Sequence, residues 1–102
     1  MLGESLIGKY VLVRCNDAGV HTGILCEIEG RSCLLKESRR LWYWKVLDRH
    51  CFLSGVAVHG LDKSSKVGET VSSILLTEDC EIIEISTAAE ISIRGIPAYE
   101  NK

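Results

Sequence analysis

One basic and aromatic segment, residues 31–45, is the part of this sequence best suited to chemistry. It holds five basic residues and one acidic residue: Arg31, Lys36, Arg39, Arg40, Lys45 and Glu37. It also holds both tryptophans of the chain, in the run Trp42-Tyr43-Trp44. A guanidinium donates forked hydrogen bonds to phosphate, and an indole or phenol ring stacks on a base. The segment therefore predicts a site for a small phosphorylated nucleotide, with these ligand-binding residues: Lys36, Arg39, Arg40, Trp42, Tyr43 and Trp44.

The faces of this segment follow from the alternation of side chains along an extended strand. Arg40, Trp42 and Trp44 would share one face, and Arg39, Leu41, Tyr43 and Lys45 would share the other. Each face then pairs a cation with an aromatic ring. The alternative is that the tryptophans are core residues and the arginines cover them by stacking. Both descriptions hold if one tryptophan faces inward.

The remaining reactive side chains predict neither a metal site nor catalysis. His21, His50 and His59 do not stand at metal-ligand spacing from one another. The glycines of residues 19–23 lack the spacing and the lysine-serine ending of a phosphate-binding loop, and a hairpin turn explains them better. We therefore expect no metal, no cofactor and no enzymatic activity, so that a bound ligand is released unchanged.

The first third of the chain predicts an antiparallel meander. Tyr10–Cys15 is expected to be a strand followed by a turn at residues 16–19, and residues 24–29 alternate with the period of a second strand. Gly23 is expected to mark a bulge at the start of that strand. A two-residue turn at Glu29-Gly30 then leads into a strand at residues 33–36.

The rest of the chain adds helices to further strands. We expect a buried helix at residues 51–58 closed by Gly60, a polar loop at residues 62–69, and a hairpin made of strands Val71–Leu76 and 80–85. Thr87 and Glu90 match a capping box at the start of a last helix, which Gly95 and Pro97 stop. The predicted fold is a single α+β domain, residues 1–102. It contains a small twisted antiparallel sheet or partial barrel of about five strands, a central helical segment and a short C-terminal helix.

The amino-acid composition limits the possible binding partners of the protein and the cellular compartment in which it acts. The formal net charge of −2 argues against binding to polymeric nucleic acid or to an anionic membrane by overall charge. The five cysteines form no Cys-x-x-Cys pair, and an odd number of them favours free thiols in a reducing cytoplasm. No stretch predicts a signal peptide or a membrane span. The acidic stretch of residues 78–90 is expected to be a solvated face or to meet the basic segment.

Several runs together resemble an uncharacterised family of small proteins encoded by bacteriophages and prophages. They are Tyr10-Val11-Leu12-Val13-Arg14, then Ala18-Gly19-Val20 with Gly23, then Arg39-Arg40-Leu41-Trp42-Tyr43-Trp44. The stretch 81–83 and the ending from Thr87 to Pro97 also fit, whereas residues 45–51 depart from the pattern. The resemblance implies no assigned activity, but it implies a phage protein in the cytoplasm of a host cell.

In that setting, small β-rich proteins with basic and aromatic pockets often counter host defence. The resemblance and the basic segment together predict a non-enzymatic sponge that sequesters a phosphorylated cyclic nucleotide signal. A chain this short is expected to need a neighbouring subunit to build a deep pocket, so we expect a homo-oligomer. The alternatives are a protein-protein interaction module, a minor structural phage module, or a direct inhibitor of a host defence enzyme, each using Trp42-Tyr43-Trp44.

Overall fold

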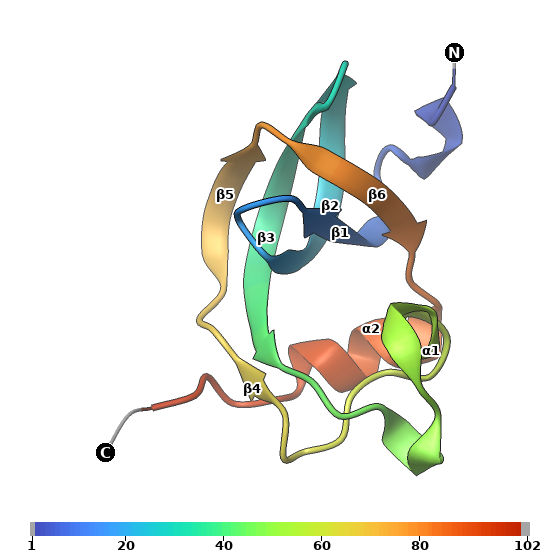
Figure 1. Ribbon diagram of the computed structural model, residues 1–102, viewed down its shortest axis with the longest axis vertical. Coiled ribbons are helices and arrows are strands. Elements are labelled where there is room, and N and C mark those ends of the chain that lie inside the picture. Colours follow the sequence, from blue (N-terminus) through green and yellow to red (C-terminus); the bar gives the residue numbers. More distant parts are fainter. Residues whose placement is uncertain (1, 101–102) are drawn as a thin grey trace.

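The fold is an open, strongly bent antiparallel sheet with two helices against one end (Figure 1). The computed structural model describes residues 2–100. The strands are β1 (Tyr10–Cys15), β2 (Val20–Glu29), β3 (Ser32–Tyr43), β4 (Lys66–Val67), β5 (Val71–Leu76) and β6 (Asp79–Glu84). The helices are α1 (Phe52–His59) and α2 (Thr87–Arg94), with 3-10 turns at Glu4–Leu6 and Leu47–Arg49. The α+β prediction is confirmed, with six strands in place of about five.

The meander predicted for the first third forms, and its strands are longer than expected. β2 begins at Val20, and the chain reaches it through a turn in which Gly19 has a φ of 85°. β3 continues through the whole basic and aromatic run as far as Tyr43. The register between β2 and β3 shifts between Thr22 and Ile24, where Gly23 faces both Glu37 and Ser38, so the bulge is opposite Gly23, on β3 at Glu37. A side chain there would meet the backbone oxygen of Lys36 at 3.0 Å, so the glycine allows β3 to approach closely.

The second predicted hairpin is wrong. β5 pairs with β3 and β6 pairs with β1, so residues 77 and 78 connect two strands that join opposite edges of the bent sheet. Thr77-Glu78 lacks the Asn-Gly or Gly-containing pair that a tight two-residue hairpin favours. β4 occupies the remaining part of the β3 edge, within the segment that was expected to be only a polar loop.

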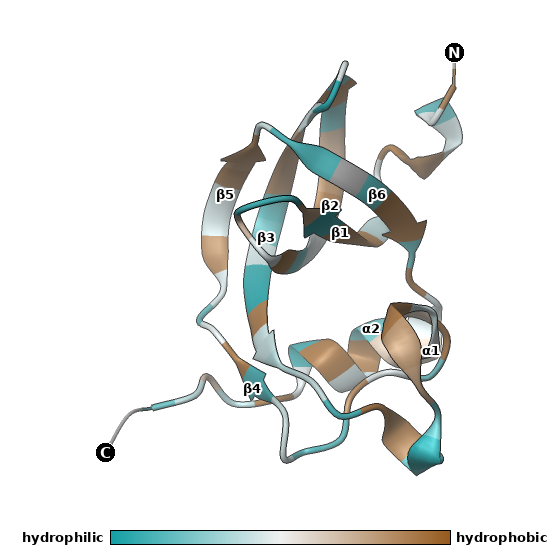
Figure 2. Ribbon diagram, viewed as in Figure 1, coloured by the Kyte–Doolittle hydropathy of each residue, from teal (hydrophilic) through white to brown (hydrophobic). Residues whose placement is uncertain are grey.

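Two clusters of apolar side chains lie on opposite faces of the sheet. Inside the bend, Val11 and Val13 pack with Leu25, Leu35 and Leu76. The other face is covered by the helices, where one cluster joins these residues: Tyr10, Leu12, Val20, Leu41, Val56, Leu61, Val67, Ala89 and Ile93. Figure 2 shows β1 as hydrophobic along most of its length, as expected for a central strand covered on both faces.

The two helices lie close to where they were predicted, but the prediction that the first is buried is wrong, because α1 buries only Val56 and Ala57 and leaves Phe52 in solvent. α1 ends at Gly60, whose φ of 93° is readily adopted only by glycine. α2 ends before Gly95, but the capping box at Thr87 is wrong by one residue. Ser86 is the N-cap, and its Oγ accepts a hydrogen bond from the Ala89 amide at 3.1 Å. Glu90 instead pairs with Arg94, at 2.8 Å.

The acidic stretch forms ion pairs within the chain, but its strand partners lie on and beside β1 rather than in the basic segment. Glu81 accepts from Arg14 at 2.9 Å, and Glu84 lies 3.4 Å from Lys9. Both pairs are exposed, so each adds at most about 1 kcal/mol to stability. Free thiols are confirmed at Cys26, Cys33 and Cys51, while the side chain of Cys80 lies outside the described part of the structure.

Candidate functional site

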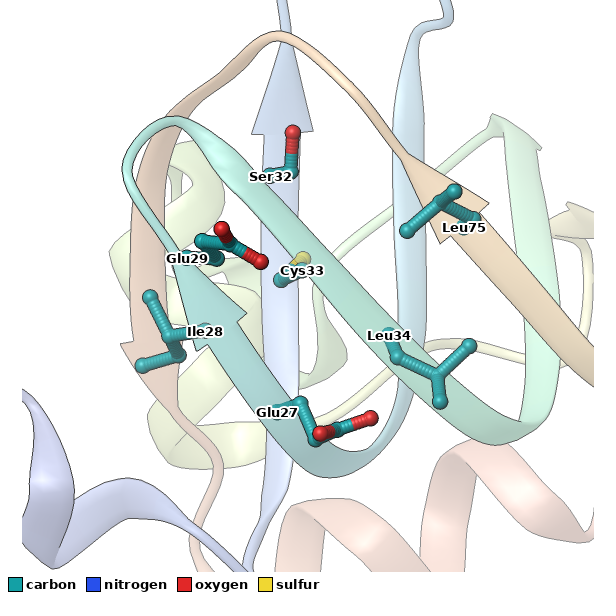
Figure 3. Close-up of a pocket in the computed structure, with 7 residues that line it drawn as sticks. All are labelled: Glu27, Ile28, Glu29, Ser32, Cys33, Leu34 and Leu75. Carbon is teal, nitrogen blue, oxygen red and sulfur yellow. The ribbon is translucent and has the colours of Figure 1, made fainter.

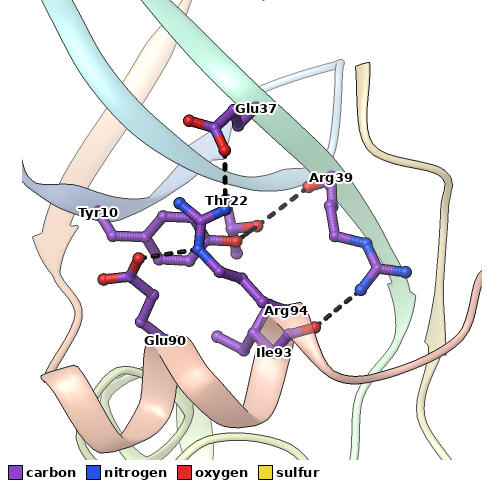
Figure 4. Close-up of polar contacts among 7 residues, drawn as sticks. All are labelled: Tyr10, Thr22, Glu37, Arg39, Glu90, Ile93 and Arg94. Atoms are coloured by element: carbon purple, nitrogen blue, oxygen red, sulfur yellow. Dashed lines mark hydrogen bonds and ion pairs between the residues drawn. The ribbon is translucent and has the colours of Figure 1, made fainter. Parts of the chain in front are cut away.

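Arg39 is part of the scaffold rather than of an exposed site. Its side chain is only 4% exposed, and its Nε donates to the Gly68 oxygen at 2.9 Å. Its Nη1 donates to the Ile93 oxygen at 2.8 Å (Figure 4). Ile93 lies in the last turn of α2, where the carbonyls lack helical partners and attract a cation. Burial lowers the pKa of this guanidinium. Because its donors are used inside the fold, Arg39 is not available to a ligand arriving from solvent.

The surroundings of Arg39 tie β1, β2 and α2 together. The Tyr10 hydroxyl lies 2.9 Å from the Thr22 hydroxyl, which donates to the Arg39 oxygen at 3.5 Å. The Arg94 guanidinium lies over the Tyr10 ring at 4.7 Å and bonds Glu37 at 3.0 Å. Figure 4 shows these contacts meeting between β3 and the end of α2. The sequence predicted that a cation and an aromatic ring from the same strand would pair. The pair observed here is made by Tyr10 of β1 and Arg94 of α2.

The two tryptophans have different environments. Trp42 is 67% exposed, whereas Trp44 is partly buried and packs against the cluster beneath the helices. Tyr43 is half exposed at the end of β3, and Lys36 is exposed on the other side of the Glu37 bulge. Of the six predicted site residues, the structure therefore places Arg40 and Trp42 together on the exposed face of β3.

That face gains two residues from distant parts of the chain. The Lys66 Nζ lies 5.2 Å from the centroid of the Trp42 ring and 5.0 Å from that of Tyr99. The two rings meet edge to face, with centroids 5.5 Å apart. Lys66 comes from β4, and the Tyr99 amide donates to the Val67 oxygen at 2.9 Å, which holds the C-terminal segment beside β4 (Figure 1). We call Arg40, Trp42, Lys66 and Tyr99 the aromatic-lysine face.

A groove of about 480 Å³ borders this face. It lies between residues 63–66 and residues 96–100, and both Lys66 and Tyr99 line it. Lys63 lines this groove as well. The same lysine also lines a second, apolar groove of about 640 Å³ beside Ile91 and Pro97. Among the described residues, neither Lys63, Lys66 nor Arg40 has a carboxylate partner within ion-pair distance. The first groove therefore carries two lysines that form no ion pair with a described residue, together with the carboxylate of Glu100.

The loop before β4 is held rigidly enough to present these lysines. The Asp62 carboxylate accepts hydrogen bonds from the Ser64 amide at 3.0 Å and its hydroxyl at 2.7 Å, and these bonds lower the pKa of Asp62. Ser65 is buried and accepts from the Lys45 amide at 2.9 Å. The two lysines therefore project from a segment with defined backbone bonds.

A hollow of about 320 Å³ at the β2–β3 hairpin is less suited to a phosphorylated ligand. Figure 3 shows Glu27 and Glu29 on β2 and Leu75 on β5 around Cys33. The two carboxylates oppose an anion. Burial, and then the nearby Asp79, raise the pKa of the Cys33 thiol to about 12, so the thiolate needed for reaction is scarce at neutral pH.

Sequence reasoning missed Lys63, Lys66 and Tyr99. The two lysines were visible as part of a polar loop, but nothing in the local pattern indicated that this loop adds a strand to β3. Tyr99 stands 57 positions after Trp42 in the chain, so only the tertiary structure brings the two rings together.

Comparison with known proteins places the chain in a family. The family described as a domain of unknown function (DUF6948) matches residues 8–93. The chain belongs to this family. The match covers every strand of the sheet and includes Arg40, Trp42 and Lys66, whereas Tyr99 lies beyond it. No curated protein and no solved structure matches the chain. No described helix combines the length and the hydropathy needed to cross a bilayer.

Proposed function

We propose that this DUF6948 protein binds a phosphorylated nucleotide on the aromatic-lysine face and releases it chemically unchanged. The observation that carries the proposal is the position of the Lys66 ammonium against both the Trp42 and the Tyr99 rings, at the edge of an open groove. An ammonium without a carboxylate partner attracts phosphate, and an exposed indole stacks a base for about 1–3 kcal/mol.

The ligand makes two kinds of contact in this proposal, one through its phosphate and one through its base. Lys66 and Lys63 supply positive charge along the groove, where a phosphate would replace the water around them. Trp42 offers its exposed ring surface to a base.

The cellular role we propose follows the resemblance to small phage and prophage proteins. A non-enzymatic binder of a cyclic nucleotide lowers the free concentration of a signal without destroying it. The protein would then act in the host cytoplasm as a sponge that blunts a nucleotide-based defence.

The test is a thermal-shift screen with cyclic dinucleotides, cyclic trinucleotides and cyclic ADP-ribose isomers. A ligand present at 100 times its Kd stabilises the folded state by about 2.7 kcal/mol, which raises the Tm by several degrees for a domain of this size. We expect at least one such ligand to raise the Tm, and chromatography after denaturation to recover it intact. A hydrolysed product would contradict the absence of catalysis.

Two matched variants locate the site. Lys66→Met should reduce the shift strongly, whereas Lys36→Met, an exposed lysine on the same sheet that lines neither groove, should leave it unchanged. Equal effects of the two variants would contradict the placement of the site.

Exposed aromatic surface favours a second candidate, a contact with a protein partner. Trp42 and Tyr43 are 67% and 50% exposed, and tryptophan, tyrosine and arginine dominate the energetics of protein interfaces. If no nucleotide in the panel shifts the Tm, the nucleotide proposal fails and protein contact becomes the better account of this face.

A further inference from the structure

A small cavity beside the aromatic-lysine face has the lining of a base-recognition site. It has a volume of about 180 Å³ and lies between β2, β3 and the segment that enters β5. Its walls are made by six residues: His21, Ser38, Arg40, Glu69, Val71 and Ile74. At about 30 Å³ for each water of the liquid, it has room for one ring system but not for a whole nucleotide.

One of the residues that line the cavity has a buried polar group that the fold leaves unused. Ser38 is 1% exposed, and its hydroxyl has no hydrogen-bond partner among the described residues. Buried hydroxyls are normally bonded, because desolvating one without a partner is unfavourable. His21 is equally buried, and its Nε2 lies 2.9 Å from the Ala18 oxygen, which only accepts. Nε2 therefore carries the proton, and Nδ1 of the neutral ring is an acceptor.

The mouth of the cavity carries one positive and one negative side chain. Arg40 pairs with His21 across the strands, and its backbone oxygen accepts from the Gly68 amide at 2.8 Å, which brings the following residue, Glu69, to the same rim. Neither Arg40 nor Glu69 has an ion-pair partner among the described residues. This pair disfavours a simple anion or cation and suits a neutral ligand with donors on one side and acceptors on the other.

We infer that this cavity recognises a guanine base. Guanine presents two adjacent acceptors, O6 and N7, that match the fork of a guanidinium, and two adjacent donors, N1–H and the N2 amino group, that match the two oxygens of a carboxylate. Adenine has only its exocyclic amino group as a donor on these edges, so it satisfies only part of the hydrogen-bonding capacity of Arg40 and Glu69. Val71 and Ile74 supply the apolar wall for the ring, and Ser38 gains a partner.

The inference rests on the proposed function, because the cavity adjoins the proposed phosphate site. Arg40 and Trp42 stand two residues apart on the same face of β3, a separation of about 7 Å along a strand. A base in the cavity therefore directs its phosphate towards Lys66, and Trp42 remains available to stack the second base of a cyclic dinucleotide. Arg40 then contacts the base, and the phosphate is left to the lysines.

Calorimetric titration with GMP, AMP and guanosine separates the two sites. We expect GMP to bind at least about tenfold more tightly than AMP, since one well-formed bidentate pair discriminates bases by that order. Glu69→Gln should weaken GMP about tenfold and bring GMP and AMP close together, whereas Glu29→Gln on the distant hairpin should change neither. Lys66→Met should weaken GMP and AMP by the same factor and preserve their ratio.

Ser38→Ala provides a control for folding. Because the hydroxyl has no partner in the free protein, this variant should unfold at the same or a slightly higher temperature while binding guanosine less tightly. Equal affinity for GMP and AMP, with Glu69→Gln without effect, would overturn the guanine site and leave the phosphate site standing. Guanosine binding as tightly as GMP would support the guanine site and contradict the role of the lysines.

Discussion

Arg39 and Arg40 are neighbours in the chain, yet alternation along β3 gives them opposite roles. Arg39 turns beneath the helices and bonds two backbone oxygens, whereas Arg40 stays in solvent at the rim of a cavity. Two neighbouring positions on β3 thus face opposite sides of the sheet, so that Arg39 stabilises the fold and Arg40 belongs to the proposed site.

Substitution of each arginine by alanine should separate these roles. Arg39→Ala removes two charge-assisted hydrogen bonds from a buried position, so we expect it to lower the free energy of unfolding by about 2–4 kcal/mol. Arg40→Ala should change that free energy by less than about 0.5 kcal/mol and weaken nucleotide binding at least about tenfold. Urea unfolding and calorimetric titration measure the two effects. A stable Arg39→Ala protein would contradict the scaffold role.

His21 predicts a specific dependence of stability on pH. Burial lowers its pKa in the folded protein, with a smaller contribution from Arg40 and against the effect of the hydrogen bond to Ala18. The unfolded chain keeps an ordinary histidine pKa near 6.5. As the pH falls below about 6.5, the unfolded state binds a proton that the folded state does not, so the free energy of unfolding decreases.

This loss of stability should have a slope of at most about 1.4 kcal/mol per pH unit for one group, and it should level off below the folded-state pKa. Urea titrations of the wild type and His21→Gln between pH 7.5 and pH 5 isolate the effect as the difference between the two proteins. Parallel curves would show that His21 takes no part in it.

At the scale of elements, local patterns predicted both helices and every strand except β4, but they did not predict how all the strands pair. Tyr10–Cys15 and Val71–Leu76 have the predicted bounds, because apolar runs between turn residues are local signals. The β5–β6 hairpin was wrong because the choice of partner depends on which sheet edges remain free, which local patterns do not show. The last helix begins one residue early because Ser86 and Thr87 are both competent caps.

The candidate site was predicted in part for the same reason. Alternation along one strand correctly separated Arg39 from Arg40 and Trp42. It did not predict Lys66, Tyr99 or Glu69, because these reach the face through the pairing of β4 with β3 and through the return of the C-terminal segment. Trp44 lies beyond the end of β3, so the alternation that would have exposed it no longer applies.

The junction between α1 and α2 depends on Gly60. A side chain there would approach Cβ of Ser92 to 2.6 Å, and the Ser92 hydroxyl bonds both the amide and the oxygen of Leu61. We expect Gly60→Ala to cost more stability than Gly8→Ala. Gly8 also has a positive φ, of 88°, but faces open space, so its substitution should cost only about 1–2 kcal/mol of backbone strain. Equal losses of stability for the two variants in thermal unfolding would show that α2 moves away from a new side chain at little cost in free energy.

At the scale of the whole molecule, we expect self-association. The groove beside α2 is lined by Leu47, Leu61, Ile91 and Ile96, and Phe52 on α1 is largely exposed. A symmetric dimer is the commonest way to cover such a surface. Light scattering at micromolar concentration and physiological salt should give a multiple of the chain mass of 11.3 kDa. The monomer mass would contradict a pocket shared between subunits.

Fluorescence of Trp42 during nucleotide titration shows directly whether a ligand binds the aromatic-lysine face. In a Trp44→Phe variant, Trp42 is the single tryptophan, and it lies 67% exposed on the aromatic-lysine face. A base or phosphate bound there changes the surroundings of its ring. We predict a saturable change in emission with at least one guanine-containing cyclic nucleotide, and its loss on Lys66→Met substitution. Constant emission while calorimetry detects bound nucleotide would place the ligand elsewhere on the protein. This result would contradict a nucleotide site on the aromatic-lysine face.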